Sequence, residues 1–233
     1  MREESSQFWI SLFPNGINTV RPPEGAWMTK PELFRRIREE LKRTVHLLHD
    51  QLRRDHPNDH VYAILFEVDV SGTYVIRVAG SEESLTRLAE KYAAKGYQVK
   101  SGDLLESLRA MLRWDAPGDD KDGWYWGNQD DDVEMARLLD QAVQAGQIEE
   151  YGEDQFLRTL CFDALRELDS EGAFGLGSER ERVLIGTCCC EVGFGENEHV
   201  EELATLNPPR TISRLRRELQ TAIAADRALF RPR

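Results

Sequence analysis

The chain has 233 residues, of which 40% are hydrophobic and 31% charged, and its formal net charge is −12. These values are typical of a globular protein with an apolar core. No run of about 18 apolar residues is present, which argues against a membrane-spanning helix. The first residues lack the basic and apolar regions of a secretory signal, so we expect a cytoplasmic protein.

The charge is unevenly distributed. Residues 210–233 contain seven Arg against Glu218 and Asp226, a balance of +5, so the rest of the chain carries −17. Such an acidic body repels nucleic acid and anionic lipid and attracts basic partners. Alternatively, the acidity serves solubility alone. We expect the Arg-rich tail to neutralise the acidic body or to form an exposed helix face rather than to contact nucleic acid.

The first elements follow an irregular N-terminal extension over residues 1–28, which Pro and Gly interrupt repeatedly. Thr29 is a candidate N-cap, with Pro31 in the first turn, and apolar residues continue at helical spacing. We therefore predict a helix over residues 29–55, ended by Pro57.

A β-hairpin is the clearest local pattern. The strands are predicted at 61–70 and 73–78, rich in β-branched and aromatic residues, around a Ser71-Gly72 turn. Ser81 then begins a helix that ends at Gly96. A short strand at 97–99 and an amphipathic helix over 104–112 follow.

The second half is predicted to contain helices over 133–145, 153–168, 196–206 and 211–229. Residues 182–191 form a nearly continuous apolar run, which predicts a strand at a central position in the sheet. The elements do not alternate strictly, so we expect an α+β fold with a mainly antiparallel sheet, made by hairpin 61–78 and strand 182–191. Residues 29–209 would form one domain, with 210–233 a basic helix packed on it.

The four Cys are Cys161 and the run Cys188-Cys189-Cys190. Adjacent thiols in a strand point to opposite faces and cannot converge on one metal. We therefore expect structural Cys, with no disulfide and no zinc.

Residues 113–132 combine seven Asp with Trp114, Trp124, Tyr125 and Trp126. Aromatic anchors surrounded by charge are typical of a binding hot spot. If residues 123–127 are extended, Trp124 and Trp126 share a face. In the alternative interpretation the Trp side chains fill the core, the Asp side chains are solvated, and Asp130–Asp132 cap the next helix. The candidate binding residues are Arg113, Trp114, Asp115, Asp119, Asp120, Asp122, Trp124, Tyr125 and Trp126.

Metal and nucleotide sites are not expected. Asp120 and Asp122 have the spacing that opens a calcium loop, as do Asp130 and Asp132, but neither pair continues with the turn glycine. The pairs His46/His49 and His56/His60 lack a further ligand at a suitable spacing, and no HExxH motif is present. Residues 193–195 resemble a phosphate loop but are surrounded by acids. No cofactor is therefore predicted.

The expected elements follow the order helix, hairpin, helix, Leu112-Arg113-Trp114, Trp-Tyr-Trp loop, helix, strand and Leu206-Asn207-Pro208. This order resembles a bacterial domain-of-unknown-function family, number 4303. The resemblance covers about residues 30–215. It implies an α+β domain without an established activity. Small acidic domains of this kind often act as immunity or accessory proteins, which is an analogy of fold class alone.

These observations favour a non-enzymatic, acidic protein-binding module, such as an immunity-type inhibitor of a basic toxin or nuclease. A second hypothesis is an enzyme whose cleft combines Arg113, Asp115, Trp124 and Glu67. A third is a structural subunit of a larger assembly. The partner is expected to be a basic protein, and the sequence leaves the oligomeric state open.

Overall fold

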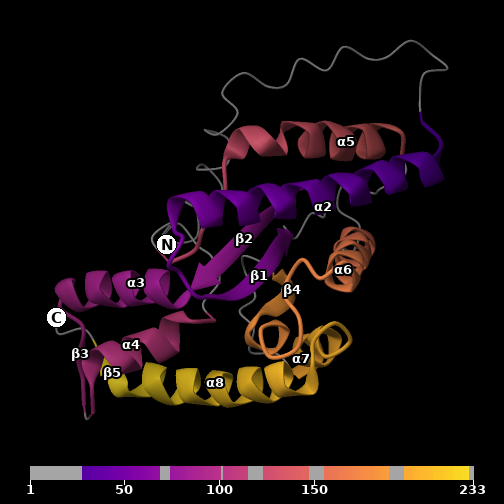
Figure 1. Cartoon of the computed structure of the whole chain (residues 1–233). Helices are drawn as coiled ribbons and strands as arrows, with labels where there is room; N and C mark the ends of the chain where they lie inside the picture. Colours follow the sequence, from indigo (N-terminus) through magenta and orange to yellow (C-terminus); the bar gives the residue numbers. More distant parts are fainter. Residues whose placement is uncertain are drawn as a thin grey trace.

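The computed structural model describes residues 28–68, 74–100, 102–114, 123–146, 155–188 and 197–230. A three-stranded sheet with the order β2-β1-β4 lies at the centre of the described part (Figure 1). Its strands are β1 (Val61–Val68), β2 (Val75–Ser81) and β4 (Leu184–Cys188), all almost entirely buried. Helices surround this sheet, so the fold is α+β.

The predicted hairpin is confirmed in its pairing. Strands β1 and β2 are antiparallel, with Leu65 opposite Val78, and the register shifts between Val61 and Ala63. The predicted turn at residues 71–72 lies outside the described residues. The β-branched and aromatic content of these residues therefore predicts this local pair correctly.

The predicted central position of the strand at 182–191 is wrong. In the described part of the chain β4 is an edge strand, and it runs parallel to β1, with Ile64 opposite Ile185. The sheet is therefore mixed, and β1 is its central strand. The apolar run is buried because helices α6 (Gln155–Ser170) and α7 (Asn197–Leu203) pack against it. Burial by helices and burial between strands leave the same apolar pattern in a sequence.

The outer edge of β4 is closed by side chains. Asn207 Nδ2 donates to the Ile185 carbonyl at 2.7 Å, and the Ile185 amide donates to Asn207 Oδ1 at 2.9 Å. The backbone of Thr187 bonds to His199. Buried Arg180 donates to Asn207 Oδ1 at 3.3 Å and to Asp169 at 2.5 Å. The outward backbone groups of Ile185 are thus satisfied without a further strand.

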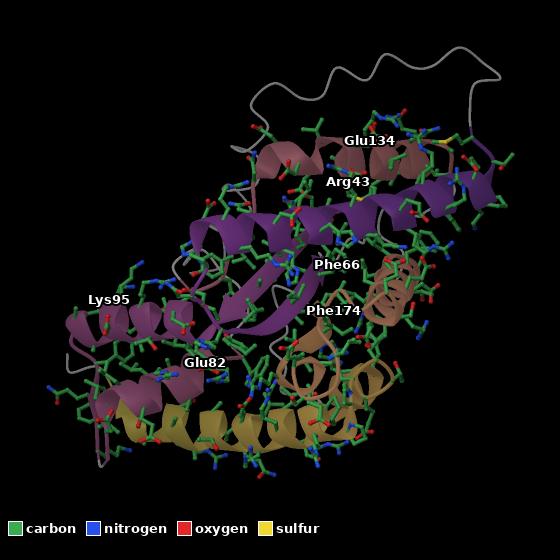
Figure 2. All side chains as sticks on the ribbon, in the orientation of Figure 1. Arg43, Phe66, Glu82, Lys95, Glu134 and Phe174 are labelled. Atoms are coloured by element: carbon green, nitrogen blue, oxygen red, sulfur yellow. The ribbon has the colours of Figure 1, made fainter. Side chains whose placement is uncertain are left out.

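Helix α2 (Lys30–Asp55) is the longest described element and begins after Thr29, as predicted, although the Thr29 side chain makes no capping hydrogen bond. It contacts β2, α6 and the antiparallel helix α5 (Val133–Gln144), which lies alongside it (Figure 1). Arg36 pairs with Glu134 at 2.9 Å between α2 and α5. Figure 2 shows side chains filling the space along this helix pair. Its buried residues recur at helical spacing: Leu33, Ile37, Leu41, Val45, Leu48 and Leu52.

Helices α3 (Glu82–Ala94), α4 (Leu104–Leu112) and α8 (Pro209–Ala228) form the other side of the molecule in Figure 1, where α4 contacts both neighbours. The predicted start of α3 is confirmed by a capping box between Ser81 and Ser84. Strand β3 (Gln98–Val99) pairs with β5 (Leu229–Phe230), which the sequence did not predict. Two short 3₁₀ helices, η1 (Gln129–Asp132) and η2 (Arg180–Arg182), complete the described elements.

The basic residues of α8 are partly neutralised by acids of the body. Arg210 pairs with Glu181 at 3.1 Å, and Arg216 pairs with Glu201 at 2.6 Å. These contacts agree with the expected neutralising role of the tail. Among the described helices, none has the length and apolarity that a bilayer crossing requires. The division into an extension, one domain and a C-terminal helix stays a prediction.

Candidate functional site

Tyr62, near the start of β1, is the residue at which three of the predicted site residues meet. Trp114 packs edge-on against its ring at 5.5 Å, and Trp124 at 6.0 Å. The Arg113 guanidinium lies 4.6 Å from the ring centroid, and the Tyr62 hydroxyl donates to the Arg113 carbonyl at 3.2 Å. We call these four residues the Tyr62 cluster. Sequence reasoning missed Tyr62 because it is one of many apolar positions in a strand.

Gly80 of β2 makes room for this cluster. A Cβ atom at Gly80 would lie 2.7 Å from the Tyr62 ring and hydroxyl and 3.1 Å from the Trp124 ring. Both distances are shorter than ordinary van der Waals contact, so a larger residue would displace the rings. The glycine is thus required by close packing rather than by backbone conformation.

The two tryptophans of the cluster belong to the core. Trp114 and Trp124 are each 4% exposed. The Trp114 indole Nε1 donates to Glu218 Oε2 at 3.2 Å, and burial raises the pKa of the Glu218 carboxyl. Their burial supports the alternative in which the Trp side chains fill the core, because a surface anchor must be accessible to its partner.

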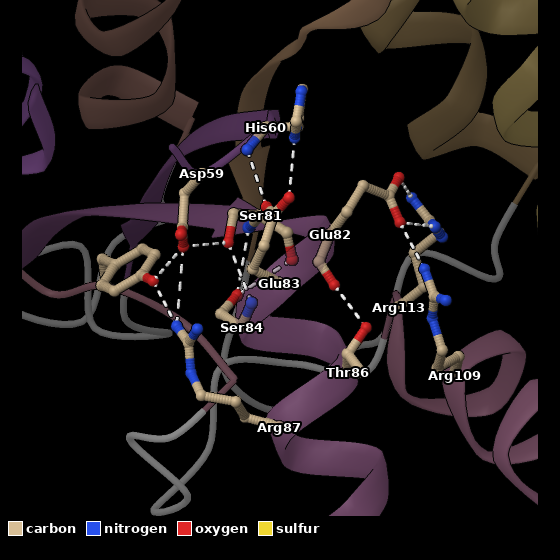
Figure 3. Close-up of polar contacts among 11 residues, drawn as sticks. Asp59, His60, Ser81, Glu82, Glu83, Ser84, Thr86, Arg87, Arg109 and Arg113 are labelled. Carbon is tan, nitrogen blue, oxygen red and sulfur yellow. Dashed lines mark hydrogen bonds and ion pairs between the residues drawn. The ribbon is translucent and has the colours of Figure 1, made fainter. Parts of the chain in front are cut away.

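Arg113 is held by an ion-pair network at the start of α3 (Figure 3). Its two terminal nitrogens donate to the two Glu82 oxygens at 2.7 and 2.5 Å, and Arg109 donates to the same carboxylate at 2.8 Å. Burial alone would raise the pKa of Glu82, but the hydrogen bonds and charges of Arg113 and Arg109 lower it. This bidentate geometry fixes Arg113 over the Tyr62 ring.

Tyr125 lies next to β2 rather than in the Tyr62 cluster. Its amide and carbonyl bond to the carbonyl and amide of Ala79, at 2.8 and 2.9 Å. Its hydroxyl donates to Asp59 and accepts from Arg87 at 2.5 Å. Trp126 follows, partly buried, with an indole Nε1 that is shielded from solvent and has no hydrogen-bond partner among the described residues. The structure therefore separates Tyr125 and Trp126 from Arg113 and Trp114.

The Asp132 side chain is mostly buried and makes no capping hydrogen bond, contrary to the alternative expectation for residues 130–132. It stands at the N-cap of α5 without a capping hydrogen bond, and its carboxylate accepts from the fully buried Arg77. Arg77 also donates to the Asn128 carbonyl at 2.7 Å. Burial raises the pKa of Asp132 to about 6, although Arg77 opposes this rise. The Asn128 side chain is the group that caps η1.

The remaining predicted binding residues are Asp115, Asp119, Asp120 and Asp122, and they lie outside the described residues. Their part in binding stays a prediction. The described residues on either side are Trp114, in the Tyr62 cluster, and Gly123, next to Trp124 of the cluster.

The histidines do not assemble a metal site in the part of the chain that is described. No group of three or more His, Cys, Asp or Glu side chains there could hold a metal ion. His60 pairs with Glu83 at 2.6 Å, and burial lowers the pKa of the half-buried His49. Burial also lowers the pKa of His199, whose Nδ1 lies 3.2 Å from Nη2 of Arg158.

Glu67, the acid of the alternative enzyme hypothesis, is remote from the Tyr62 cluster. It lies five residues beyond Tyr62 on β1, opposite Ile76 and Cys188, and is 4% exposed. Five residues of strand span about 16 Å. The structure therefore joins Arg113 to Trp124 but does not bring Glu67 to them.

Two cysteines are described, Cys161 and Cys188, and both are buried. Burial raises the pKa of Cys161, which suppresses its reactive thiolate form. Cys188 lies in β4. Cys189 and Cys190 lie outside the described residues.

The chain matches the model of the family "Domain of unknown function (DUF4303)" over residues 41–208. The match includes the Tyr62 cluster, Glu82 and Asn207. No curated protein and no solved structure matches the chain. Because the matched region is most of its length, the chain belongs to the family Domain of unknown function (DUF4303).

Proposed function

We propose that this protein is a non-enzymatic binding module that recognises a basic protein through the acidic segment at residues 115–122. The observation that carries the proposal is the anchoring of this segment at both ends. Trp114 and Trp124 pack on the same Tyr62 ring, and both are buried. An element with fixed ends loses less conformational entropy on binding than a free chain does.

The charge of the segment suits a basic partner. It contains Asp115, Asp119, Asp120 and Asp122 against Lys121. Lys and Arg nearly balance Asp and Glu among the described residues, so most of the net charge of −12 falls in the other segments. Charge complementarity accelerates encounter and selects partners more than it adds affinity.

The described carboxylates near the segment also favour binding over catalysis. Glu82 is held by Arg113 and Arg109, and Asp59 accepts from Ser81 at 2.8 Å and from Tyr125. A general acid or base needs access to its substrate. In its more specific form, the proposal is that the partner is a basic toxin or nuclease. This protein would then inhibit that partner as an immunity protein inhibits its toxin.

The test compares two variants of equal charge. The D119N/D120N/D122N variant neutralises the proposed contact, and E149Q/E150Q/E153Q removes the same charge from another segment. Each protein is immobilised and exposed to an extract of the cells that produce it, at low and high salt, with quantitative mass spectrometry. A basic protein retained at low salt by the wild type and by the Glu variant, but lost from the Asp variant, is expected.

Two results would contradict the proposal. If both variants lose the partner equally, net charge rather than this segment controls the interaction. If the Asp variant unfolds, as judged by circular dichroism, the segment is structural, because exposed charges contribute little to stability.

A further inference from the structure

A cavity of about 400 Å³ lies where the C-terminal end of α2, the start of β1 and the turn at residues 172–175 meet. Its apolar lining includes Leu52, Val61, Ile64 and Phe174. Leu52, Ile64 and Phe174 are each at most 5% exposed, so the floor of the cavity is part of the core. A rigid apolar floor of this kind suits a small molecule better than a protein surface.

The polar part of the lining is rich in positive charge. Arg53 and Arg182 line the cavity, and neither has an ion pair with any described residue. The adjacent Arg54, in contrast, pairs with Asp55 at 3.1 Å. His60 also lines the cavity, and Glu83 raises the pKa of its imidazole, which favours the cationic form.

Two acids share the lining. Asp59 accepts a hydrogen bond from Ser81 at 2.8 Å, and Arg87 lies 3.5 Å from its carboxylate. Glu179 faces the cavity from the turn that follows Phe174. Arg87 compensates the charge of Asp59, and Glu83 compensates that of His60, so the two arginines outweigh Glu179 in charge.

We propose that this cavity is a binding site for a small organic anion. A carboxylate or phosphate group would contact Arg53 and Arg182, and an apolar body would rest on Leu52, Ile64 and Phe174. Planar guanidinium groups recognise both kinds of oxyanion through paired hydrogen bonds. The volume lies near the lower limit for ligand pockets, so the ligand is compact. The site does not involve the segment at 115–122 and is independent of the proposed function.

The test is calorimetric titration of the full chain with phenyl phosphate and with benzoate. Inorganic phosphate lacks the apolar body and phenol lacks the charge, so each is expected to bind at least about tenfold more weakly than the matching organic anion. Comparison of phenyl phosphate with benzoate shows which oxyanion the site prefers.

A matched pair of variants locates the site. The R53Q/R182Q variant removes both arginines of the cavity, and R54Q/R166Q removes two exposed arginines that do not line it. Binding of the preferred anion is expected to weaken about tenfold or more in the first variant and to stay unchanged in the second. Circular dichroism of each variant checks that it is folded.

Three outcomes would overturn the inference. The first is that neither organic anion saturates the wild type at millimolar concentration. The second is that inorganic phosphate binds as tightly as phenyl phosphate. The third is that both double variants weaken binding equally. The last outcome would mean that the anion responds to overall charge and not to this cavity.

Discussion

Asn207 exchanges two hydrogen bonds with the backbone of Ile185, at 2.7 and 2.9 Å, and so occupies the place of a neighbouring strand. The same side chain donates to the Leu203 carbonyl at 2.9 Å. Because Asn207 is buried, none of these groups can exchange its partner for water. In the Leu206-Asn207-Pro208 sequence, Asn207 therefore has a structural role, which is to close the edge of β4.

Replacing Asn207 with Ala is expected to lower the free energy of unfolding by about 2–4 kcal/mol, because both backbone groups of Ile185 lose a buried partner. Urea denaturation measures this change through the midpoint at constant slope. Asn58→Ala, at an exposed position, is the control and should change stability by less than about 0.5 kcal/mol. A stable N207A protein would mean that water or another side chain reaches the edge.

Gly186 and Leu203 provide a test of the packing between β4 and α7. A Cβ atom at Gly186 would lie 2.1 Å from Leu203 Cδ2, so Gly186→Ala should cost about 1–3 kcal/mol through overpacking. Leu203→Ala should cost about 2–5 kcal/mol by leaving a cavity. The double variant should be more stable than the sum of the two losses predicts, because the new methyl group enters the space that Leu203 leaves.

The contrasting pair is Gly186→Ala with Leu176→Ala, since Leu176 is 76% exposed. Its two effects should add within about 0.5 kcal/mol. Additivity in the Leu203 pair as well would show that the two residues are not in contact.

Asp132 should make stability depend on pH. Burial raises its pKa from 3.8 to about 6, so the folded protein holds this proton more tightly than the unfolded chain does. As pH rises from about 4 to 6, the wild type should therefore lose up to roughly 3 kcal/mol relative to Asp132→Asn, which cannot titrate. Chemical denaturation at several pH values measures the difference. If the difference in unfolding free energy between the two proteins is the same at every pH, the folded protein does not hold the Asp132 proton more tightly than the unfolded chain.

Arg113 should not tolerate a lysine. Arg113→Lys keeps the charge but loses the paired bonds to Glu82 and the contact with the Tyr62 ring, at an expected cost of about 1–2 kcal/mol. Arg109→Lys is the matched change, and it should cost less because Arg109 makes a single bond to Glu82 and is 38% exposed. Thermal unfolding compares the two. Equal shifts of the melting temperature would mean that the bidentate geometry adds nothing to stability.

Much of the candidate site could not be read from the sequence, although three of its residues could. Residue type and the neighbouring acids are sufficient to predict Arg113, Trp114 and Trp124 as candidate site residues. Tyr62 and Gly80, which hold them together, do not, because a buried Tyr and a Gly in a hairpin are common. Their role depends on contacts across long stretches of chain: Tyr62 precedes Trp114 by more than fifty residues.

The sequence by itself determined the local elements: the hairpin, the start of α3 at Ser81 and the bounds of α4. Caps, turns and hydrophobic periodicity are interactions between near neighbours, so a short window contains them. The tertiary structure alone decided the edge position of β4, the closure of that edge by Asn207 and the burial of Asp132 against Arg77. These features join residues that are distant along the chain, and the energy that selects them is side-chain packing and desolvation, which a pattern of residue types does not encode.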